Sequence, residues 1–225
     1  SASLEGAEDA AITACGMAAV NLALLSSLNA GDHCIASDDI FCCTRSSLED
    51  ILPSKGIEVD IVNVIDIANI ENKIRPNTKV IYIEALSNPR LELADIPKIA
   101  ELAHKNNIRF IVDNTFLSPY LLRPLEHGAD MVVHSGTKYV VGHGDALCGL
   151  VSGTKEMVDR IRYYNDNLGT HISPFDSWLA LRGVRTLPIR LKAQCENAFA
   201  IAKYLEAKEE VEYVYYPGLE SHPQH

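Results

Sequence analysis

The side chains best suited to chemistry stand in one stretch, Val132–Tyr139. A short apolar run there leads directly into Ser135, Thr137 and Lys138, so two hydroxyls and one amine stand at the carboxyl end of an expected strand. In an open α/β sheet, ligands bind at that edge. A lysine amine at such a position reaches a bound carbonyl, and it is nucleophilic near neutral pH when it is desolvated. The stretch therefore predicts a carbonyl-binding lysine.

A second expected strand end supplies a carboxylate. The run Arg109–Asn114 carries Asp113 to its end, and Lys138 follows 25 residues later. Asp113 by itself is a common N-cap for the next segment, but a strand-end lysine nearby gives it a second use. Pyridoxal phosphate needs an acidic partner for its ring nitrogen, a lysine for its aldehyde and donors for its phosphate. We therefore expect a pyridoxal phosphate site that contains Asp113 and Lys138.

The phosphate of such a cofactor is expected at the start of a helix. Residues 14–19 begin a helix rich in alanine, leucine and valine that continues to Leu28. Gly16 lets the backbone approach an anion, and the free N–H groups of a helix start favour phosphate. A glycine at this place also suits a tight helix–sheet contact, so the prediction depends on Ser135 and Thr137 as further donors to the same phosphate.

Alternating strands and helices must position these residues. The expected strands, from apolar β-branched runs, are His33–Ser37, Glu58–Val64, Lys79–Ala85, Arg109–Asn114, Asp130–Ser135 and Leu147–Ser152. The expected helices between them are Leu48–Lys55, Ile67–Arg75, Ile96–Asn106 and Lys155–Tyr164. Continuous apolar strands that alternate with helices predict an α/β fold, a mostly parallel sheet with helices on both faces in three αβα layers.

The carboxyl-terminal part of the chain has a different pattern. One long helical pattern covers Leu187–Lys208, and Val211–Tyr215 follows as an expected strand without a partner. We interpret residues 1–185 as one large domain, and residues 186–225 as a linking helix and the start of a second domain. Both ends of the chain look like cuts, so the chain is expected to be the middle of a larger protein.

Composition argues against several classes of partner. The formal net charge is −10, from 30 acidic and 20 basic residues, which disfavours nucleic acid and anionic membrane. No apolar run approaches membrane-spanning length, and the amino end lacks the layout of a signal peptide. The six cysteines include no C-x-x-C pair. They favour reduced, mostly packed thiols in a cytoplasmic protein without a metal site.

Five segments, in this order, resemble the cysteine/methionine-metabolism family of pyridoxal-phosphate enzymes. They are Asp38–Thr44 (DDIFCCT), Ser87–Pro89 (SNP), Val112–Tyr120 (VDNTFLSPY), Pro124–Asp130 (PLEHGAD) and Val132–Tyr139 (VVHSGTKY). That family contains cystathionine γ-synthase, the cystathionine lyases, methionine γ-lyase and O-acylhomoserine sulfhydrylases. The resemblance, which runs from Leu4 to Leu219, implies the large domain of a fold-type I pyridoxal-phosphate-dependent transferase. It also implies a homodimer or homotetramer that acts on a small amino-acid substrate.

The same resemblance implies which residues hold the cofactor. Lys138 would form the internal Schiff base and remove the substrate's α-proton, and Asp113 would keep the pyridinium nitrogen protonated. The other implied contacts are the Gly16 and Met17 amides and the Ser135 and Thr137 hydroxyls to the phosphate, Asn88 near the phenolic oxygen and the substrate carboxylate, and Phe41 stacked on the ring.

Three departures from the family pattern bear on function. Cys15 precedes Gly16 where most members have serine, which leaves the backbone donors in place. Phe41 stands where the family usually has tyrosine, so stacking is kept while a phenol that assists proton transfer is lost. The family's amino-terminal segment and carboxyl-terminal domain, which lend further phosphate-binding and carboxylate-binding residues, are expected to be missing.

Within the family, the chain resembles the methionine γ-lyases most. Cys43 stands where those enzymes have cysteine and cystathionine enzymes usually have glycine, although a small packed hydrophobe explains it equally well. The prediction is therefore γ-elimination of L-methionine to methanethiol, 2-oxobutanoate and ammonia. Cystathionine γ-lyase, cystathionine γ-synthase and O-acylhomoserine sulfhydrylase stay open, as does an inactive folded fragment that only associates. A thiol hydrolase that uses Cys15 lacks an assignable histidine.

Overall fold

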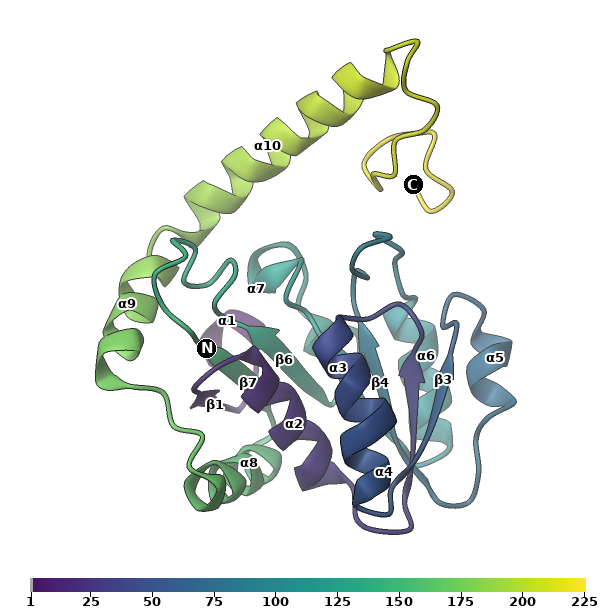
Figure 1. The fold of residues 1–225 in the computed structure, drawn as a ribbon, viewed down its shortest axis with the longest axis vertical. Helices are drawn as coiled ribbons and strands as arrows, with labels where there is room; N and C mark the ends of the chain where they lie inside the picture. The colour runs from purple at the N-terminus through teal and green to yellow at the C-terminus, as the bar shows by residue number, and fades with distance from the viewer. Residues whose placement is uncertain (1) are drawn as a thin grey trace.

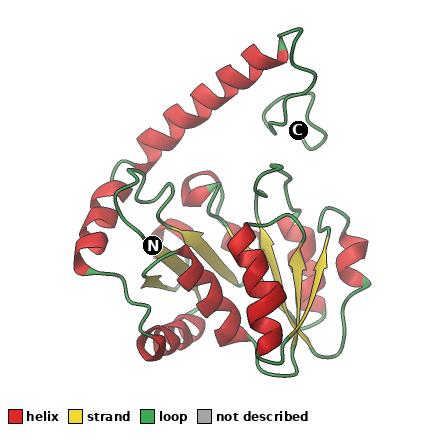
Figure 2. Ribbon diagram, in the orientation of Figure 1, coloured by secondary structure: helices red, strands yellow, loops and turns green. Residues whose placement is uncertain are grey.

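A seven-stranded sheet lies between two layers of helices (Figure 1, Figure 2). The structure is a computed structural model that describes residues 2–225. The strand order across the sheet is β1-β7-β6-β5-β4-β2-β3. The strands are β1 (Asp9–Thr13), β2 (His33–Ser37), β3 (Glu58–Val62), β4 (Thr78–Glu84), β5 (Arg109–Asp113), β6 (Met131–Ser135) and β7 (Gly149–Gly153).

The sheet is mostly parallel, as predicted. The pairs from β3 through β2, β4 and β5 to β6 are parallel, and β7 runs antiparallel to both of its neighbours, β6 and β1. The four residues Val80–Ile83 of β4 are fully buried, because helices cover the strand on both sides. This burial explains why the central strands are continuous apolar runs with no polar alternation.

One face of the sheet is covered by helices from three parts of the chain. They are α2 (Gly16–Ser27), the run of α3 (Cys42–Ser46), η1 (Ser47–Ile51) and α4 (Leu52–Ser54), and α8 (Lys155–Leu168). Leu22 of α2, Leu48 of η1 and Ile161 of α8 are completely buried in one cluster with Tyr82 of β4. Because α2 contacts the sheet on one side and neighbouring helices on others, nearly every position in it is apolar.

The other face of the sheet has its own core. It is covered by α5 (Ile67–Glu71) and α6 (Ile96–Lys105), whose Ile70 and Ile99 pack with Phe110 of β5. Asp95 caps α6 by accepting the Lys98 N–H at 3.3 Å. The short elements α1 (Ala2–Glu5), α7 (Ser118–Leu121) and η2 (Pro124–His127) complete this part of the chain. Two helical layers around one sheet confirm the three-layer αβα fold.

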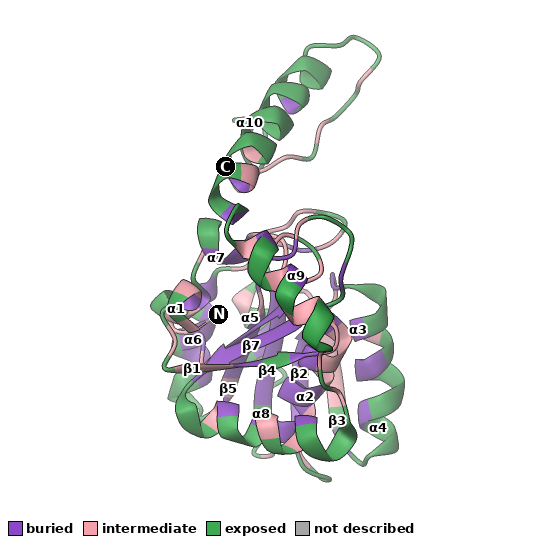
Figure 3. Ribbon diagram, turned by 90° about the vertical axis from the view of Figure 1, so that its left-hand side faces the viewer, coloured by how far each residue is buried: buried purple, intermediate pink, exposed green. Residues whose placement is uncertain are grey.

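The last helices lead away from the sheet. α9 (Pro174–Val184) begins after Ser173, whose Oγ accepts the Asp176 N–H at 3.0 Å. α10 (Leu187–Glu206) then projects from the body as an arm that is largely exposed along its length (Figure 3). The chain returns toward the sheet after α10, where the Gln224 side chain accepts the Leu93 N–H at 2.9 Å and donates to the Leu93 carbonyl at 2.8 Å. The domain division at residues 185 and 186 stays a prediction.

The expected strand at Val211–Tyr215 is wrong. This segment is not a strand, and Tyr213 and Tyr215 are exposed, with their rings 4.7 Å apart. A strand needs a neighbour for its backbone hydrogen bonds, and none of the strands in residues 2–225 pairs with the segment.

The elements not expected from the sequence include β1, α9 and the short α7 and η2. β1 contains two alanines and a terminal aspartate, which carry little strand signal, and its pairing with β7 holds it in the sheet. Several other elements differ from their expected bounds; for example, the helix expected at Leu48–Lys55 begins at Cys42. Within residues 2–225, none of the helices combines the length and apolarity that a membrane span requires.

Candidate functional site

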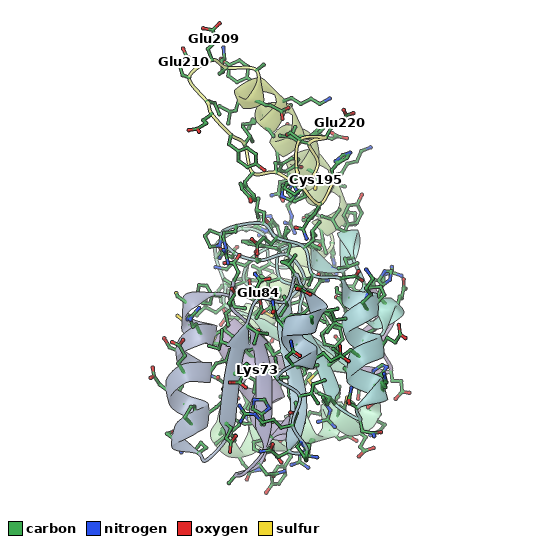
Figure 4. The ribbon with its side chains drawn as sticks, turned by 90° about the vertical axis from the view of Figure 1, so that its right-hand side faces the viewer. Lys73, Glu84, Cys195, Glu209, Glu210 and Glu220 are labelled. Atoms are coloured by element: carbon green, nitrogen blue, oxygen red, sulfur yellow. The ribbon has the colours of Figure 1, made fainter. Side chains whose placement is uncertain are left out.

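The carboxyl ends of β4, β5 and β6 present polar side chains on one face of the sheet. Glu84 of β4 is the register partner of Asp113 of β5, and Asp113 pairs with Val133 of β6, two residues before Ser135. Because side chains alternate along a strand, these three polar side chains share the face that α2 covers, as Tyr82 and Val133 do. Figure 4 shows Glu84 nearer to the α10 arm than Lys73, which lies farther down the body. The strand ends predicted to bind a ligand thus meet.

Asp113 is held by two hydrogen-bond donors. Its Oδ1 accepts the Thr115 N–H at 2.9 Å, and the Tyr82 hydroxyl donates to its Oδ2 at 3.2 Å. Burial raises the pKa of Asp113, and hydrogen bonds from Thr115 and Tyr82 oppose that rise. A buried carboxylate ionises readily only beside a cation. The protonated ring nitrogen of pyridoxal phosphate is such a cation, so the carboxyl fits this group as well as its capping role.

Glu84 is a second carboxyl at this edge that the sequence analysis missed. Only 9% of the residue is exposed. Its burial, followed by the proximity of Asp113, raises the pKa of Glu84 to about 8, so the group is neutral at neutral pH. The sequence signal that could have revealed it is a glutamate directly after the apolar run Val80–Ile83, which places it at the same edge as Asp113.

Glu84 also joins two loops that carry predicted site residues. Its Oε1 accepts the Phe41 N–H at 2.8 Å, and its carboxyl accepts the backbone N–H of Asn88. Phe41 stands at the start of α3 with 40% of its surface exposed. One carboxyl therefore fixes the backbone of the residue expected to stack on the ring and of the residue expected to face the substrate.

The start of α2 lies directly against the end of β6. A Cβ on Gly16 would lie 2.6 Å from the Ser135 Cβ and 2.7 Å from its Oγ, so only glycine permits this approach. Cys15 occupies the N-cap position but makes no side-chain capping hydrogen bond, which leaves the first N–H groups of the helix, including that of Met17, open to a ligand. Open helix amides beside a serine hydroxyl suit a phosphate.

Thr137 is already engaged within the protein. Its hydroxyl accepts the Cys148 N–H at 3.0 Å and donates to the Cys148 carbonyl at 3.3 Å. These bonds join the two ends of the loop between β6 and β7. Of the two hydroxyls predicted to serve a phosphate, Ser135 faces the open amides of α2, whereas Thr137 would have to exchange its bond to Cys148.

Lys138 lies in a tight turn just beyond β6. Its N–H donates to the Ser135 carbonyl at 3.1 Å, and its carbonyl accepts the Gly142 N–H at 2.8 Å. The residue is exposed, and its amine takes part in none of the ion pairs formed within residues 2–225. A lysine that is held by its backbone and free at its amine can take a carbonyl.

Cys43 is exposed at the start of α3, beside Cys42 and two residues from Phe41. Its exposure rules out the interpretation of Cys43 as a packed small hydrophobe. A hydrogen bond with the Cys42 thiol raises the pKa of Cys43, so the group stays a thiol at neutral pH. All six cysteines are free, and Cys34 and Cys148 are buried.

A surface hollow of about 540 Å³ lies at the opposite edge of the sheet, at the amino ends of the strands. Its lining includes Lys79, Arg109 and Asp130. Arg109 donates to Ser27 at 2.9 Å, and Asp130 holds His104 at 3.2 Å. Arg109 and Asp130 are thus engaged with other residues of the lining, and the hollow is separate from the edge that carries Asp113 and Lys138.

Comparisons with known proteins agree with this geometry. The chain is 43% identical over 227 residues to the L-methionine γ-lyase of Porphyromonas gingivalis, covering all of this chain and 57% of the relative. It is 46% identical over 219 residues to the cystathionine γ-synthase of Haemophilus influenzae, covering 96% of this chain and 59% of the relative. The crystal structure of cystathionine γ-lyase from Lactobacillus plantarum complexed with L-serine superposes with a TM-score of 0.96 at 38% identity, covering 99% of this chain and 58% of that one.

The chain spans a little more than half the length of the relatives that it matches. The profile of the family described as Cys/Met metabolism PLP-dependent enzymes matches residues 1–225. The chain therefore belongs to the Cys/Met metabolism family of pyridoxal-phosphate-dependent enzymes.

Proposed function

We propose that the protein containing this chain is a pyridoxal-phosphate-dependent carbon–sulfur lyase that converts L-methionine to methanethiol, 2-oxobutanoate and ammonia by γ-elimination. The observation that carries this proposal is the meeting of Asp113, Ser135 and the Lys138 turn at one sheet edge, against the start of α2. That arrangement offers a carboxylate, anion donors and a free amine to one ligand.

Each part of the cofactor has a residue that suits it. The amides of Gly16 and Met17 and the hydroxyl of Ser135 would hold the phosphate, Asp113 the ring nitrogen, and Lys138 the aldehyde carbon. Pyridoxal phosphate supplies an electron sink for the bond that breaks at the substrate's α-carbon. Asp113 would keep that sink effective, because its carboxylate would hold the proton on the ring nitrogen.

Lys138 is the group that moves protons. With substrate bound, the free amine of Lys138 would remove the α-proton and then relay protons so that a β-proton could leave. Loss of the β-proton allows the sulfur substituent to depart from the γ-carbon, and water then releases 2-oxobutanoate and ammonia. A positioned base of this kind contributes roughly 10²-fold to 10⁴-fold in rate.

The preference for methionine is supported by Cys43. Sequence identity does not separate the candidate substrates, since a methionine γ-lyase and a cystathionine γ-synthase match almost equally well. The Cys43 thiol is exposed beside the Phe41 segment, where it can contact a substrate side chain. Cystathionine γ-lyase, cystathionine γ-synthase or O-acylhomoserine sulfhydrylase activity is the second candidate, since a cystathionine γ-synthase relative is 46% identical.

We also infer that the protein forms a homodimer or homotetramer in the cytoplasm. Phe175, Trp178 and Leu181 of α9 are each more than half exposed, and a group of large apolar side chains on a surface favours association. The six free cysteines suit a reducing compartment. For the 225-residue chain alone, the alternative proposal is a folded fragment that associates but does not catalyse a reaction.

The proposal is tested by adding pyridoxal phosphate to the purified chain. An absorption band at about 420 nm should develop, and borohydride followed by peptide mass spectrometry should place the cofactor on Lys138. Lys138→Ala should abolish the trapping and lower elimination by roughly 10³-fold. Cofactor fixed on another lysine, or elimination by Lys138→Ala at the wild-type rate, contradicts the assignment.

The substrate is tested by offering methionine, cystathionine and O-succinylhomoserine in parallel. Methanethiol and 2-oxobutanoate from methionine support the first candidate. Turnover of cystathionine without turnover of methionine supports the second candidate function. A chain that associates in light scattering but neither takes cofactor nor turns over any of the three substrates supports the fragment reading.

A further inference from the structure

The side chain of Arg190 crosses from α10 to the turn that follows Lys138. Its Nη2 donates to the Tyr139 carbonyl at 2.9 Å and to the Gly183 carbonyl at 3.0 Å. Its Nε donates to the Thr186 hydroxyl at 3.1 Å. The guanidinium therefore joins three parts of the chain: the loop between β6 and β7, the end of α9, and the start of α10 (Figure 1).

The charge of Arg190 is not matched by a carboxylate. Arg75 and Arg162 form ion pairs with nearby acids, whereas the described contacts of Arg190 are to carbonyl and hydroxyl oxygens. Burial lowers the pKa of Arg190, and its Nη1 is buried without a hydrogen-bond partner in residues 2–225. Burying a cation at this position is costly, and no ion pair within the described part of the chain offsets that cost. The contact of the guanidinium with the turn explains why an arginine stands here.

The turn is shaped to receive this side chain. A Cβ on Gly142 would lie 1.9 Å from the Nη1 of Arg190, so the guanidinium fills the space that a side chain at residue 142 would need. The N–H of Gly142 closes the turn on the Lys138 carbonyl at 2.8 Å. α9 contacts the same turn, since a Cβ on Gly183 would lie 2.1 Å from the Val141 carbonyl oxygen.

We propose that Arg190 is a positioning residue for Lys138, because it holds the turn from Lys138 to Gly142 by its hydrogen bond to the Tyr139 carbonyl and by packing where a side chain of residue 142 would lie. The inference rests on the proposed function, in which Lys138 carries the cofactor. The further point is that a residue of α10 sets the direction of the Lys138 amine. The position of α10 therefore controls how Lys138 approaches an aldehyde.

The chain offers a matched pair of variants for the test. Gly142 and Gly144 both have positive φ, +76° and +67°, but a Cβ on Gly144 would meet nothing within 4 Å. Gly142→Ala and Gly144→Ala therefore impose the same kind of backbone strain, and only Gly142→Ala displaces Arg190. Arg190→Lys keeps the charge and most of the length but loses the fork that reaches several oxygens at once.

Two measurements are made on each variant in the 225-residue chain. Hydrogen exchange without cofactor should show the Gly142 amide exchanging roughly tenfold faster in Arg190→Lys and Gly142→Ala, with the amides of β5 unchanged. Borohydride trapping of added pyridoxal phosphate at Lys138 should be slowed by roughly tenfold or more in the same two variants. Gly144→Ala should resemble the wild type in both measurements.

The outcomes separate this inference from the proposed function. A wild-type chain that takes no cofactor at Lys138 overturns the proposed function, and the positioning role falls with it. An Arg190→Lys chain that exchanges and traps like the wild type overturns the positioning role alone. So does faster exchange spread evenly over β5 and the turn, because that pattern marks a general loss of stability.

Discussion

Glu84 and Asp113 are register partners on the neighbouring parallel strands β4 and β5, so two carboxyl groups share one end of the sheet. They cannot both ionise without repulsion in a buried setting. Burial raises the pKa of both groups, that of Glu84 to about 8, and Asp113 receives hydrogen bonds from Thr115 and Tyr82 that oppose the rise in its own pKa. Glu84 is held by the backbone N–H groups of Phe41 and Asn88, and Asp113 is the carboxyl proposed to meet the cofactor's cation.

Replacing Glu84 with glutamine should make stability less dependent on pH. The pKa of Glu84 rises from an ordinary 4.5 to about 8 on folding, so its stabilising contribution is complete below pH 4.5 and is lost as pH rises toward 8. At about 1.4 kcal/mol per pKa unit, the wild type loses on the order of 3–5 kcal/mol over this range. Urea unfolding of wild type and Glu84→Gln at pH 5 and pH 8 measures the difference.

The exposed Glu101 provides the control for that experiment. Glu101→Gln should follow the wild-type pH dependence, because no buried carboxyl is removed. If Glu84→Gln loses as much stability between pH 5 and pH 8 as the wild type, Glu84 is not the group that titrates.

Asp113→Asn should weaken cofactor binding. The amide still accepts the Thr115 N–H, but it offers no charge to a protonated ring nitrogen. A lost charge-assisted hydrogen bond is worth about 1.5–3 kcal/mol, which corresponds to roughly tenfold to hundredfold in the Kd for pyridoxal phosphate. Fluorescence titration measures this affinity. Asp66→Asn is the control, because Asp66 caps the distant α5 and asparagine caps equally well; equal weakening in both variants would remove Asp113 from the site.

Gly16→Ala should affect phosphate binding selectively. The added Cβ would meet the Ser135 side chain at 2.6 Å and force α2 away from β6. Overpacking of this kind costs about 1–3 kcal/mol and separates the open amides from the hydroxyl. The affinity for pyridoxal phosphate should fall roughly tenfold, while that for pyridoxal, which has no phosphate, should stay nearly constant. A proportional loss for both ligands would mean that the helix start does not bind the phosphate.

Phe41→Tyr should raise the rate of elimination. A phenol at this position could donate a proton to a departing sulfur, for a gain of roughly tenfold or more. Phe41→Leu should lower cofactor affinity, because stacking on the ring is lost. Phe175→Tyr, on the exposed surface of α9, is the control and should change neither quantity. A Phe41→Tyr chain with wild-type turnover would show that the phenol has no part in the reaction.

Local sequence was enough to find the strands whose burial is complete. The strand at His33–Ser37 matches its expected bounds, because every residue in it is buried. The strand at Asp9–Thr13 was missed because its stability comes from pairing with β7. Thr13 faces Gly149, which lies 136 residues later in the chain, and no local sequence pattern records such a pairing. The segment Val211–Tyr215 has the pattern of a strand but lacks a neighbour in the described residues.

The same division applies to the site. The placement of Asp113 and Lys138 at one edge of the sheet could be predicted from sequence, because each follows an apolar run and parallel strands end at one edge. Glu84 also follows an apolar run and could have been found in the same way, whereas the hydrogen bond from Tyr82 to Asp113 depends on the register between β4 and β5. The engagement of Thr137 with Cys148 depends on the direction in which β7 returns, which the spacing of apolar residues does not reveal.

That direction of return has an evolutionary consequence. Because Ser135 and Gly149 are direct partners across β6 and β7, the intervening loop leaves the sheet and re-enters it at a single point. Changes at the exposed residues 143–145, beyond the part of the loop that Arg190 and α9 hold, need not disturb the strand alignment. The surface beyond Lys138 can therefore vary while the strand ends that carry Asp113 and Ser135 keep their places in the sheet.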